Sequence, residues 1–394
     1  MHDRLVSLDA YRGFVMLAMV SGGLALPAVA EHFPDSRAWS VIAYQLEHVA
    51  WTGCSAWDLI QPSFMFIVGV AMPFSYASRV ARGDSAAAIA LHVAWRALVL
   101  VALGIFLRSN GRPQTYFTFE DVATQIGLGY VLVFLVLGRS FRTQLMAAAA
   151  ILVGYWLLFT LWPLAGPEFD SAAAGIPADW RQFDGFAAHW NKYLNPAGYF
   201  DAWFLNLFPR LERFIVNGGG YQTLNFIPSM ATMIFGVMAG EMLRGERSLV
   251  VKVGLLALAG FGCLAIGLAV DGHIWPSVQW TWSVAPIVKR IWTPSWAVFS
   301  TGWTLLTLAA FVLVIDLWKL RAWALPLVAV GMNSIAMYVM SWIFKPWVKQ
   351  TLETHLGEEA LSGTFGPVVE SILALVALWL VCFWMYRRRI FLRI

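Results

Sequence analysis

A histidine and a carboxylate stand where polar residues run directly into an apolar segment. His48 and Asp58 lie in the stretch QLEHVAWTGCSAWDLIQPSFMFIVGVAMPF, ten positions apart. A neutral imidazole can take a proton from an amine and pass it on, or it can attack a thioester and carry the acyl group itself. A carboxylate that accepts from the ring fixes its tautomer and raises its basicity. The pair therefore predicts acid–base or acyl-transfer chemistry, and the sequence does not separate the two routes.

Both residues also have structural interpretations. Trp51 and Trp57 flank the histidine, so His48 can belong to the aromatic belt of a membrane protein. Asp58 precedes Pro62, a residue typical of a first helical turn, and can cap that helix. The sequence leaves these alternatives open.

The composition excludes a soluble domain. The chain has 394 residues, of which 59% are hydrophobic and 13% charged, whereas charged residues make up about a quarter of soluble domains. The net charge of +4 is too small to indicate nucleic acid as a partner. Three widely separated cysteines indicate neither a disulfide framework nor a metal knuckle, so no metal site is predicted.

Apolar segments of about 20 residues, each long enough to span a lipid bilayer, recur along the chain. They occupy residues 10–30, 58–78, 87–107, 121–137, 144–163, 224–243, 249–270, 296–318, 324–347 and 365–386. The sequence therefore predicts an all-α polytopic membrane protein with about ten transmembrane helices. The long loop 164–221 leaves room for an eleventh, partly inserted segment. Its many Trp and Tyr residues predict a folded outer cap within a single domain, 1–394.

The short connections carry the basic residues, which predicts their side of the membrane. These residues are Arg79, Arg82, Arg139, Arg142, Arg244, Arg247, Lys319, Arg321 and the arginines of the tail. Short basic loops face the cytoplasm, so both termini are predicted to be cytoplasmic and the longer aromatic loops to lie outside. We expect an integral protein of a bacterial inner membrane.

Two motifs around these residues resemble a known family. They are H-x-x-W-x-G from His48 and D-L-x-x-P-x-F-x-F-x-x-G from Asp58, preceded by S-L-D-x-x-R-G at 7–13. Together they resemble the transmembrane acyltransferases related to heparan-alpha-glucosaminide N-acetyltransferase. The resemblance implies that His48 is the catalytic histidine. Asp58 is predicted from its residue type to accept from the imidazole and support it.

Further motifs follow in the family's order. They are IPSMATMIFGVMAGEML at 227–243, P-x-x-K-x-x-W-T-x-S from Pro286, and GMNSIAMY at 331–338. Gly236 and Gly240 have the spacing of a close helix–helix contact, which is the simpler interpretation of the first motif. Arg96, in the middle of an apolar segment, requires a partner or water, and the sequence does not name one.

The resemblance implies transfer of an acetyl group from cytoplasmic acetyl-CoA to an amino sugar at the outer face, by a protein that dimerises. An ammonium, indoles, hydroxyls and amides that can bind such an acceptor are provided by Trp51, Thr52, Lys289, Trp292, Asn333 and Ser334. Arg12 and its neighbour Asp9 are assigned to the CoA end. The alternatives are that Lys289 extends to the membrane surface beside a belt tryptophan, and that Asp9 and Arg12 pair only with each other.

The chain departs from the family pattern at four positions, which leaves the acceptor open. Thr52 stands for an asparagine, Ser341 for a histidine, Gln125 for a basic residue and Ser21 for an asparagine. An amino-sugar transporter or permease is the alternative function, because polar residues within spans and a capped outer cavity also suit a permeation path. A binding or assembly protein with a degenerate site is a third.

Overall fold

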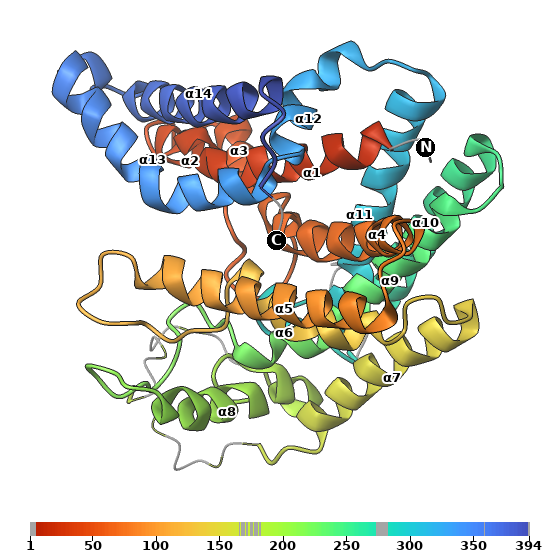
Figure 1. Cartoon of the computed structure of the whole chain (residues 1–394). Coiled ribbons are helices and arrows are strands. Elements are labelled where there is room, and N and C mark those ends of the chain that lie inside the picture. The colour runs from red at the N-terminus through yellow and green to blue at the C-terminus, as the bar shows by residue number, and fades with distance from the viewer. Residues whose placement is uncertain are drawn as a thin grey trace.

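The computed structural model describes residues 5–392 apart from 165, 167–169, 171, 174–175, 177–179, 181–182, 273–282 and 358. This described part consists of helices and loops with one isolated β-bridge and no strand (Figure 1). The α-helices are α1 (Val6–Ser21), α2 (Leu26–Ala30), α3 (Arg37–Leu46), α4 (Ile60–Ala81), α5 (Ala86–Ser109), α6 (Val122–Phe134), α7 (Phe141–Thr160), α8 (Pro196–Phe204), α9 (Phe226–Arg244), α10 (Leu249–Asp271), α11 (Pro294–Phe311), α12 (Leu325–Gly331), α13 (Ser334–Leu356) and α14 (Gly366–Arg387). The prediction of an all-α polytopic protein is confirmed.

All ten predicted apolar segments are helical, although they differ in length. Among the described residues, eight helical stretches are long and apolar enough to cross a membrane, and α12 with α13 makes a ninth that is bent by 69°. The remaining helix, α6, has 13 residues, about 20 Å at 1.5 Å per residue against a hydrocarbon core of roughly 30 Å. In the described part of loop 164–221 the longest helix, α8, has nine residues, too few for an eleventh span.

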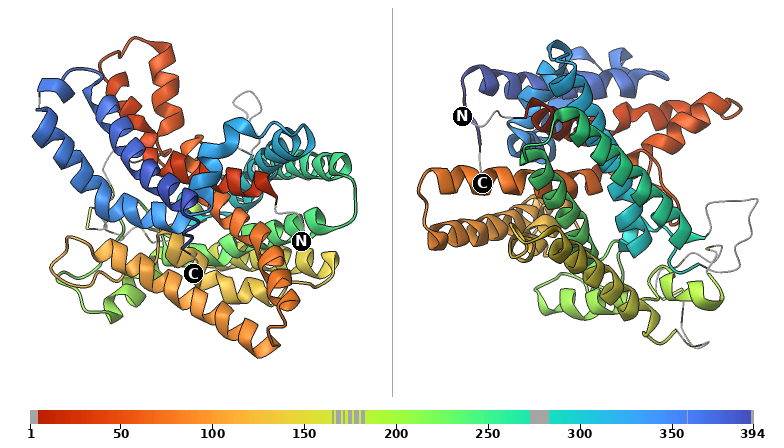
Figure 2. Two further views of the ribbon diagram at one scale, coloured as in Figure 1. Left: turned by 45° about the horizontal axis from the view of Figure 1, so that its top comes forward. Right: turned by 90° about the vertical axis from the view of Figure 1, so that its right-hand side faces the viewer.

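Helix α4 is the central element of the bundle. It packs against α1, α9, α11 and α6. Helices α12, α13 and α14 lie beyond α1, and α5 lies on the other side of α4 (Figures 1 and 2). Any space along α4 is therefore bounded by helices from both ends of the chain.

Small residues allow the central helices to touch through their backbones. A Cβ atom on Gly69 of α4 would lie 2.0 Å from the Met233 carbonyl oxygen of α9, and one on Gly240 would lie 2.4 Å from the Val70 carbonyl oxygen. Gly236 also meets α4, with Phe66 O at 2.2 Å. The packing interpretation of Gly236 and Gly240 is thereby confirmed.

Two of the predicted spans are interrupted. The first, predicted as continuous over 10–30, has four successive residues with φ between 52° and 65°, from Gly22 to Ala25, which separate α1 from α2. The left-handed backbone conformation costs little at the two glycines, whereas at Leu24 and Ala25 it costs about 1–2 kcal/mol per residue. The second break, at Met332–Asn333, separates α12 from α13. Interrupted helices in membranes occur where the freed backbone lines a cavity or is bonded by side chains. Lys345 does the latter, donating to the Val20 carbonyl at 2.6 Å.

The described residues of loop 164–221 pack onto the bundle. Trp190 is fully buried and stacks on Phe159 of α7 with ring centroids 4.8 Å apart. Its carbonyl accepts from the indole nitrogen of Trp51 at 3.0 Å. The loop therefore contacts the segment that carries His48, as expected of a cap. The limits of the cap and the single domain 1–394 remain predictions.

Candidate active site

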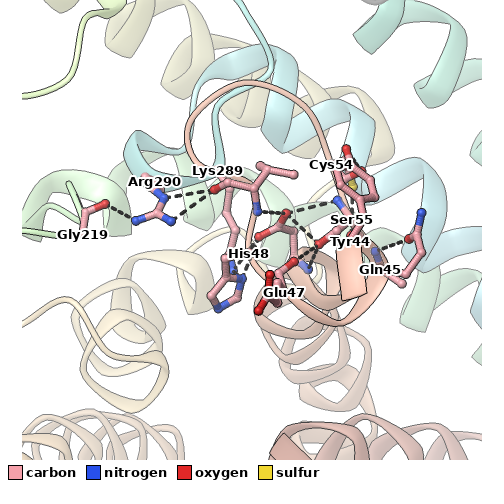
Figure 3. Close-up of polar contacts among 12 residues, drawn as sticks. Tyr44, Gln45, Glu47, His48, Cys54, Ser55, Gly219, Lys289 and Arg290 are labelled. Carbon is pink, nitrogen blue, oxygen red and sulfur yellow. Dashed lines mark hydrogen bonds and ion pairs between the residues drawn. The ribbon is translucent and has the colours of Figure 1, made fainter. Parts of the chain in front are cut away.

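His48 and Asp58 are in direct contact. His48 lies in the loop between α3 and α4, and Asp58 lies in the 3-10 turn Trp57–Leu59 that leads into α4. His48 Nδ1 is 2.8 Å from Asp58 Oδ1. The other oxygen, Oδ2, accepts from the backbone nitrogens of Val49 at 3.3 Å and Ser55 at 3.1 Å, and from Ser55 Oγ at 3.0 Å (Figure 3).

The contacts of Asp58 decide between its two interpretations. Neither the 3-10 turn nor α4 receives a side-chain cap from its N-cap residue. The donors to Asp58 come instead from residues 48–55, which precede it in the chain. Asp58 therefore ties the histidine loop to the start of α4, and the helix-capping interpretation is wrong.

Lys289 is the third member of the cluster. Its Nζ lies 3.2 Å from Asp58 Oδ1 and 3.0 Å from His48 Nδ1, and its side chain is 3% exposed. Asp58 is ionised in this network because it accepts from several donors and faces an ammonium group. We therefore assign a proton to the ring nitrogen 2.8 Å from the carboxylate, so that Nδ1–H donates to Asp58. When the ring is neutral, this assignment leaves Nε2 unprotonated.

The electrostatic surroundings favour a neutral ring. Burial lowers the pKa of His48 from its usual value of 6.5, Asp58 acts in the opposite direction, and the Lys289 ammonium and the Arg290 guanidinium lower it further. Burial also lowers the pKa of Lys289 to about 8, against the raising effect of Asp58. The His48 side chain, which is 38% exposed, can thus present Nε2 as a base or nucleophile.

The loop 286–295 is closed on itself and holds Lys289 at its tip. Three hydrogen bonds within the loop close it. Val288 N donates to Thr293 Oγ1 at 3.0 Å, and Ser295 Oγ donates to the Pro286 carbonyl at 2.8 Å. Thr293 Oγ1 and Ser295 Oγ bond to each other at 3.0 Å. Trp292 adopts a left-handed φ of 47° in this turn. The lysine, threonine and serine of the P-x-x-K-x-x-W-T-x-S motif thus have defined places in one rigid loop.

The same loop is attached to the histidine loop. Thr52 and Val288 form an antiparallel β-bridge, and Gly53 N donates to Ile287 O at 3.0 Å. Arg290 donates to the Val49 carbonyl at 3.1 Å and 3.3 Å, and also to the Gly219 carbonyl. These contacts place Lys289 beside His48 although 241 residues separate them.

The remaining residues that we predicted for the acceptor lie elsewhere. Trp51 and Trp292 are 6% and 0% exposed and belong to the packing that supports the loops. Thr52 is exposed, and its backbone forms the β-bridge with Val288. Asn333 is buried at the α12–α13 break, where its Oδ1 accepts from Leu392 N at 3.4 Å. Of the predicted set, His48, Asp58 and Lys289 are brought together, whereas these residues are not.

A cavity of about 370 Å³, which we call the histidine cavity, adjoins the cluster. His48 and Lys289 line it together with polar and aromatic side chains that sequence reasoning did not select: Trp57, Gln61, Arg108, Glu120, Asp121, Tyr221, Ser341, Trp342 and Lys345. Arg108 lies 3.7 Å from Glu120 and stacks over Trp342 at 5.0 Å. Burial raises the pKa of Glu120. The sequence signalled the charged members only as charges at the ends of apolar segments, and Ser341 only as a departure from the family pattern.

A second cavity of about 570 Å³, the arginine cavity, lies toward the other end of α4. Its basic lining residues are Arg12, Arg79, Arg82, His92 and Arg96. Its middle is apolar, with residues such as Met16, Ile67 and Leu100, and Ser334 also lines it. Met19, Val122 and Tyr338 line both cavities, so the two spaces adjoin.

Two basic residues at this end are now placed. Arg12 Nη1 lies 3.7 Å from Asp9 Oδ1, which confirms the predicted i, i+3 pair, and Arg12 also lines the cavity. The guanidinium of Arg96 lies over the Tyr130 ring at 5.0 Å. Its Nε is buried and has no hydrogen-bond partner among the described residues. Arg96 therefore faces a space that can accept a negatively charged group.

These features define a multi-pass helical membrane protein with a His–Asp–Lys cluster next to two adjoining cavities. Comparison with known proteins agrees with this class. Heparan-alpha-glucosaminide N-acetyltransferase of Homo sapiens is 24% identical over 440 aligned residues, which cover 99% of this chain and 60% of the human protein. The protein of the same name from Mus musculus is 26% identical over 105 residues, 27% of this chain and 14% of the mouse protein.

The chain is a distant relative of heparan-alpha-glucosaminide N-acetyltransferase, and the resemblance predicted from its motifs is confirmed. It spans about 60% of the length of the human relative. No family model matches it.

Proposed function

We propose that the protein is a membrane acetyltransferase that moves an acetyl group from acetyl-CoA to an amino sugar such as glucosamine. One observation supports this above the others: the histidine cavity and the arginine cavity adjoin along α4. A thioester donor needs a basic site for its nucleotide and a narrow apolar path to the reacting group. The two cavities offer both in that order.

The donor fits the arginine cavity in size and charge. Arginine binds phosphate through planar, charge-assisted hydrogen bonds, and Arg12, Arg79, Arg82 and Arg96 supply guanidinium groups along its lining. The pantetheine arm would follow the apolar middle past Met19 and Val122. Only the thioester then reaches the histidine cavity.

The chemistry assigned to His48 begins at Nε2. In direct transfer, the amine nitrogen attacks the thioester carbonyl while Nε2 takes its proton, and the departing CoA thiolate then receives that proton. In the other route, Nε2 attacks the carbonyl and CoA leaves as the thiolate. The amine then attacks the acetyl group on the ring, its proton passes to the thiolate, and Nε2 is released unprotonated. Both routes need an unprotonated Nε2, which a neutral ring that donates from Nδ1 to Asp58 would offer.

The acceptor is assigned to the histidine cavity. An aminohexose offers one ammonium group, several hydroxyls and an apolar ring face. Glu120 can accept from the ammonium, Gln61 and Ser341 can bond hydroxyls, and Trp342 and Tyr221 offer aromatic faces. The departures from the family pattern at Thr52 and Ser341 lie near this side, so the acceptor need not be the one in the relatives' name.

Orientation follows from the loop charges. The arginine cavity lies at the end of α4 that carries Arg79 and Arg82, which belong to the short basic loops. Short basic loops face the cytoplasm, where acetyl-CoA is made. We assign the histidine cavity to the outer side, and the protein to a bacterial inner membrane with both termini cytoplasmic.

The test uses the purified full chain with acetyl-CoA and glucosamine, and follows release of free thiol and formation of acetylated sugar. We expect turnover that His48→Ala reduces by about 10²–10⁴-fold. His32→Ala, which removes an exposed histidine outside both cavities, serves as the matched control. Absence of turnover with any amine would contradict the enzyme assignment. Uptake of labelled sugar into vesicles without acetyl-CoA would instead support a permease.

A further inference from the structure

Lys289 has no role in either transfer route above. Its Nζ contacts Asp58 and the protonated side of the His48 ring at 3.2 Å and 3.0 Å. The ammonium is therefore engaged before any ligand arrives.

The position of Lys289 is fixed by its backbone. The closures of loop 286–295 and the β-bridge between Thr52 and Val288 hold the turn on both sides. Arg290 bonds the Val49 carbonyl, and Val49 N in turn bonds Asp58. A lysine held so firmly next to an imidazole–carboxylate pair imposes its charge on that pair.

The formal charges show what Lys289 changes. A lone Asp58 would favour the imidazolium form of His48, because the two charges would cancel. With Lys289 present, the carboxylate charge is already balanced, and protonation of the ring would put a second cation within 3.0 Å of the first.

The other charged groups do not reverse this result. Those facing the ring or its cavity are Arg290 from the lysine loop, Arg108 of α5, Glu120 and Asp121 before α6, and Lys345 of α13. The two cavity cations and two cavity carboxylates cancel in formal charge, and Arg290 adds a further positive charge. Tyr221, whose ring centroid lies 6.4 Å from that of His48, is neutral.

We propose that Lys289 is a positioning residue for the proposed transfer reaction: its ammonium occupies Asp58 from the side of Nδ1 and opposes protonation of His48. The ring is thereby kept neutral as the Nδ1–H tautomer, with Nε2 free toward the substrate. This role rests on the proposed function for its purpose, but the protonation state can be measured without turnover.

The first experiment measures that state directly. The full chain is prepared in detergent with ¹⁵N- and ¹³C-labelled histidine, and the seven histidines are titrated by NMR. His48→Gln identifies the His48 signals. We expect the Nδ1–H tautomer in the wild type at pH 6.5. A ring that is mainly imidazolium, or a neutral tautomer protonated at Nε2, at this pH overturns the proposal.

The second experiment removes the ammonium. In Lys289→Met, the titration of His48 is expected to move to higher pH. The decline of the transfer rate on the acid side of its pH profile, which we call the acid limb, is expected to move with it. The rate near neutral pH should fall at least about tenfold. Lys289→Arg keeps the charge and should restore both the titration and the acid limb.

Lys192→Met is the matched control. This lysine is also buried, donates to the Gly218 carbonyl at 3.0 Å and lines neither cavity, so its loss should leave the His48 titration unchanged. An unchanged His48 titration in Lys289→Met would overturn the proposal. If Lys289→Met does not fold, the His48 titration in Lys289→Gln and the tautomer measured in the wild type test the proposal in its place. An expected titration without any acetyl transfer would count against the proposed function alone.

Discussion

The two cavities at the ends of α4 differ in the elements and in the charged residues that line them. The arginine cavity takes most of its basic residues from the helices α1, α4 and α5, and Arg82 from the position just after α4, and it is apolar in the middle. The histidine cavity is lined in part by loops and turns, and its formal charges come in opposed pairs such as Lys289 with Asp58 and Arg108 with Glu120. The first suits a long anionic ligand, and the second suits a small polar ligand with a cationic group.

The cavities also differ in how tightly their charged groups are held. Arg82 is more than half exposed at its side chain, and it shares Asp84 with Arg79. By contrast, Asp58 and Lys289 are 1% and 3% exposed and are bonded from several sides. Mobile cations are sufficient to attract a nucleotide, whereas proton transfer needs groups fixed within a fraction of an ångström. Substitutions at the two ends should therefore act on different steps.

The largest effect is expected where the two cavities meet. Val122→Phe should close the shared wall and reduce acetyl-CoA turnover to background, because the thioester can no longer reach His48. A short donor, S-acetyl-N-acetylcysteamine, should still be used, since it can enter the histidine cavity directly. Thiol release with both donors measures this. Val131→Phe, an exposed position on the same helix, is the control, and equal loss with both donors would contradict a through-passage.

Asp58→Asn should have the next largest effect and act only at the histidine end. The amide can no longer hold the Nδ1–H tautomer, and Lys289 loses the partner that balances its charge. We expect turnover to fall by about 10²-fold with little change in the KM for acetyl-CoA. A comparable rise in that KM would show that the two ends are not separate.

The double substitution Arg79→Gln with Arg82→Gln should act only at the arginine end. Each charge-assisted contact is worth about 1.5–3 kcal/mol, so loss of two contacts should raise the KM for acetyl-CoA by about 10²-fold or more while kcat stays near the wild-type value. Acetyl-pantetheine, which lacks the nucleotide, should be unaffected. Arg139→Gln with Arg142→Gln, on the same side but outside the cavity, is the control.

The smallest effect concerns pH. His48 acts through its neutral form, whose population rises with pH, and burial lowers the pKa of the ring below 6.5. The transfer rate should therefore hold down to pH 6.5 and decline only below it, as measured in kcat/KM profiles. Glu120→Gln, which removes the nearby carboxyl with a raised pKa, should leave this decline in place. A midpoint above pH 6.5 would contradict a neutral ring.

Local patterns were sufficient for much of the fold and for part of the site. Apolar runs of about 20 residues located every long helix, and the ten-residue spacing of His48 and Asp58 placed both at the mouth of α4. The left-handed turn after Ser21 was missed although Gly22 and Gly23 signalled it, since an apolar run hides a change of handedness in its middle.

Long-range contacts could not be predicted from such patterns. Lys289 was recognised as important through its motif and was assigned to the sugar, because its partner lies 241 residues away. Trp51 and Trp292 look like exposed aromatic platforms in the sequence but are buried supports. Glu120 and Arg108 gave only the signal of charges near a membrane surface, and their shared cavity depends on how α5, α6 and α13 pack.

Met19, Val122 and Tyr338 have a second consequence for a cell that maintains a membrane potential. They lie where two spaces open to opposite sides of the proposed bilayer meet, and each elementary charge that crosses releases about 2.3 kcal/mol per 100 mV. Apolar constrictions exclude ions by shedding water. In the proposed transfer, the same three side chains admit a thioester and must also insulate, and shortening them is expected to cause a proton leak.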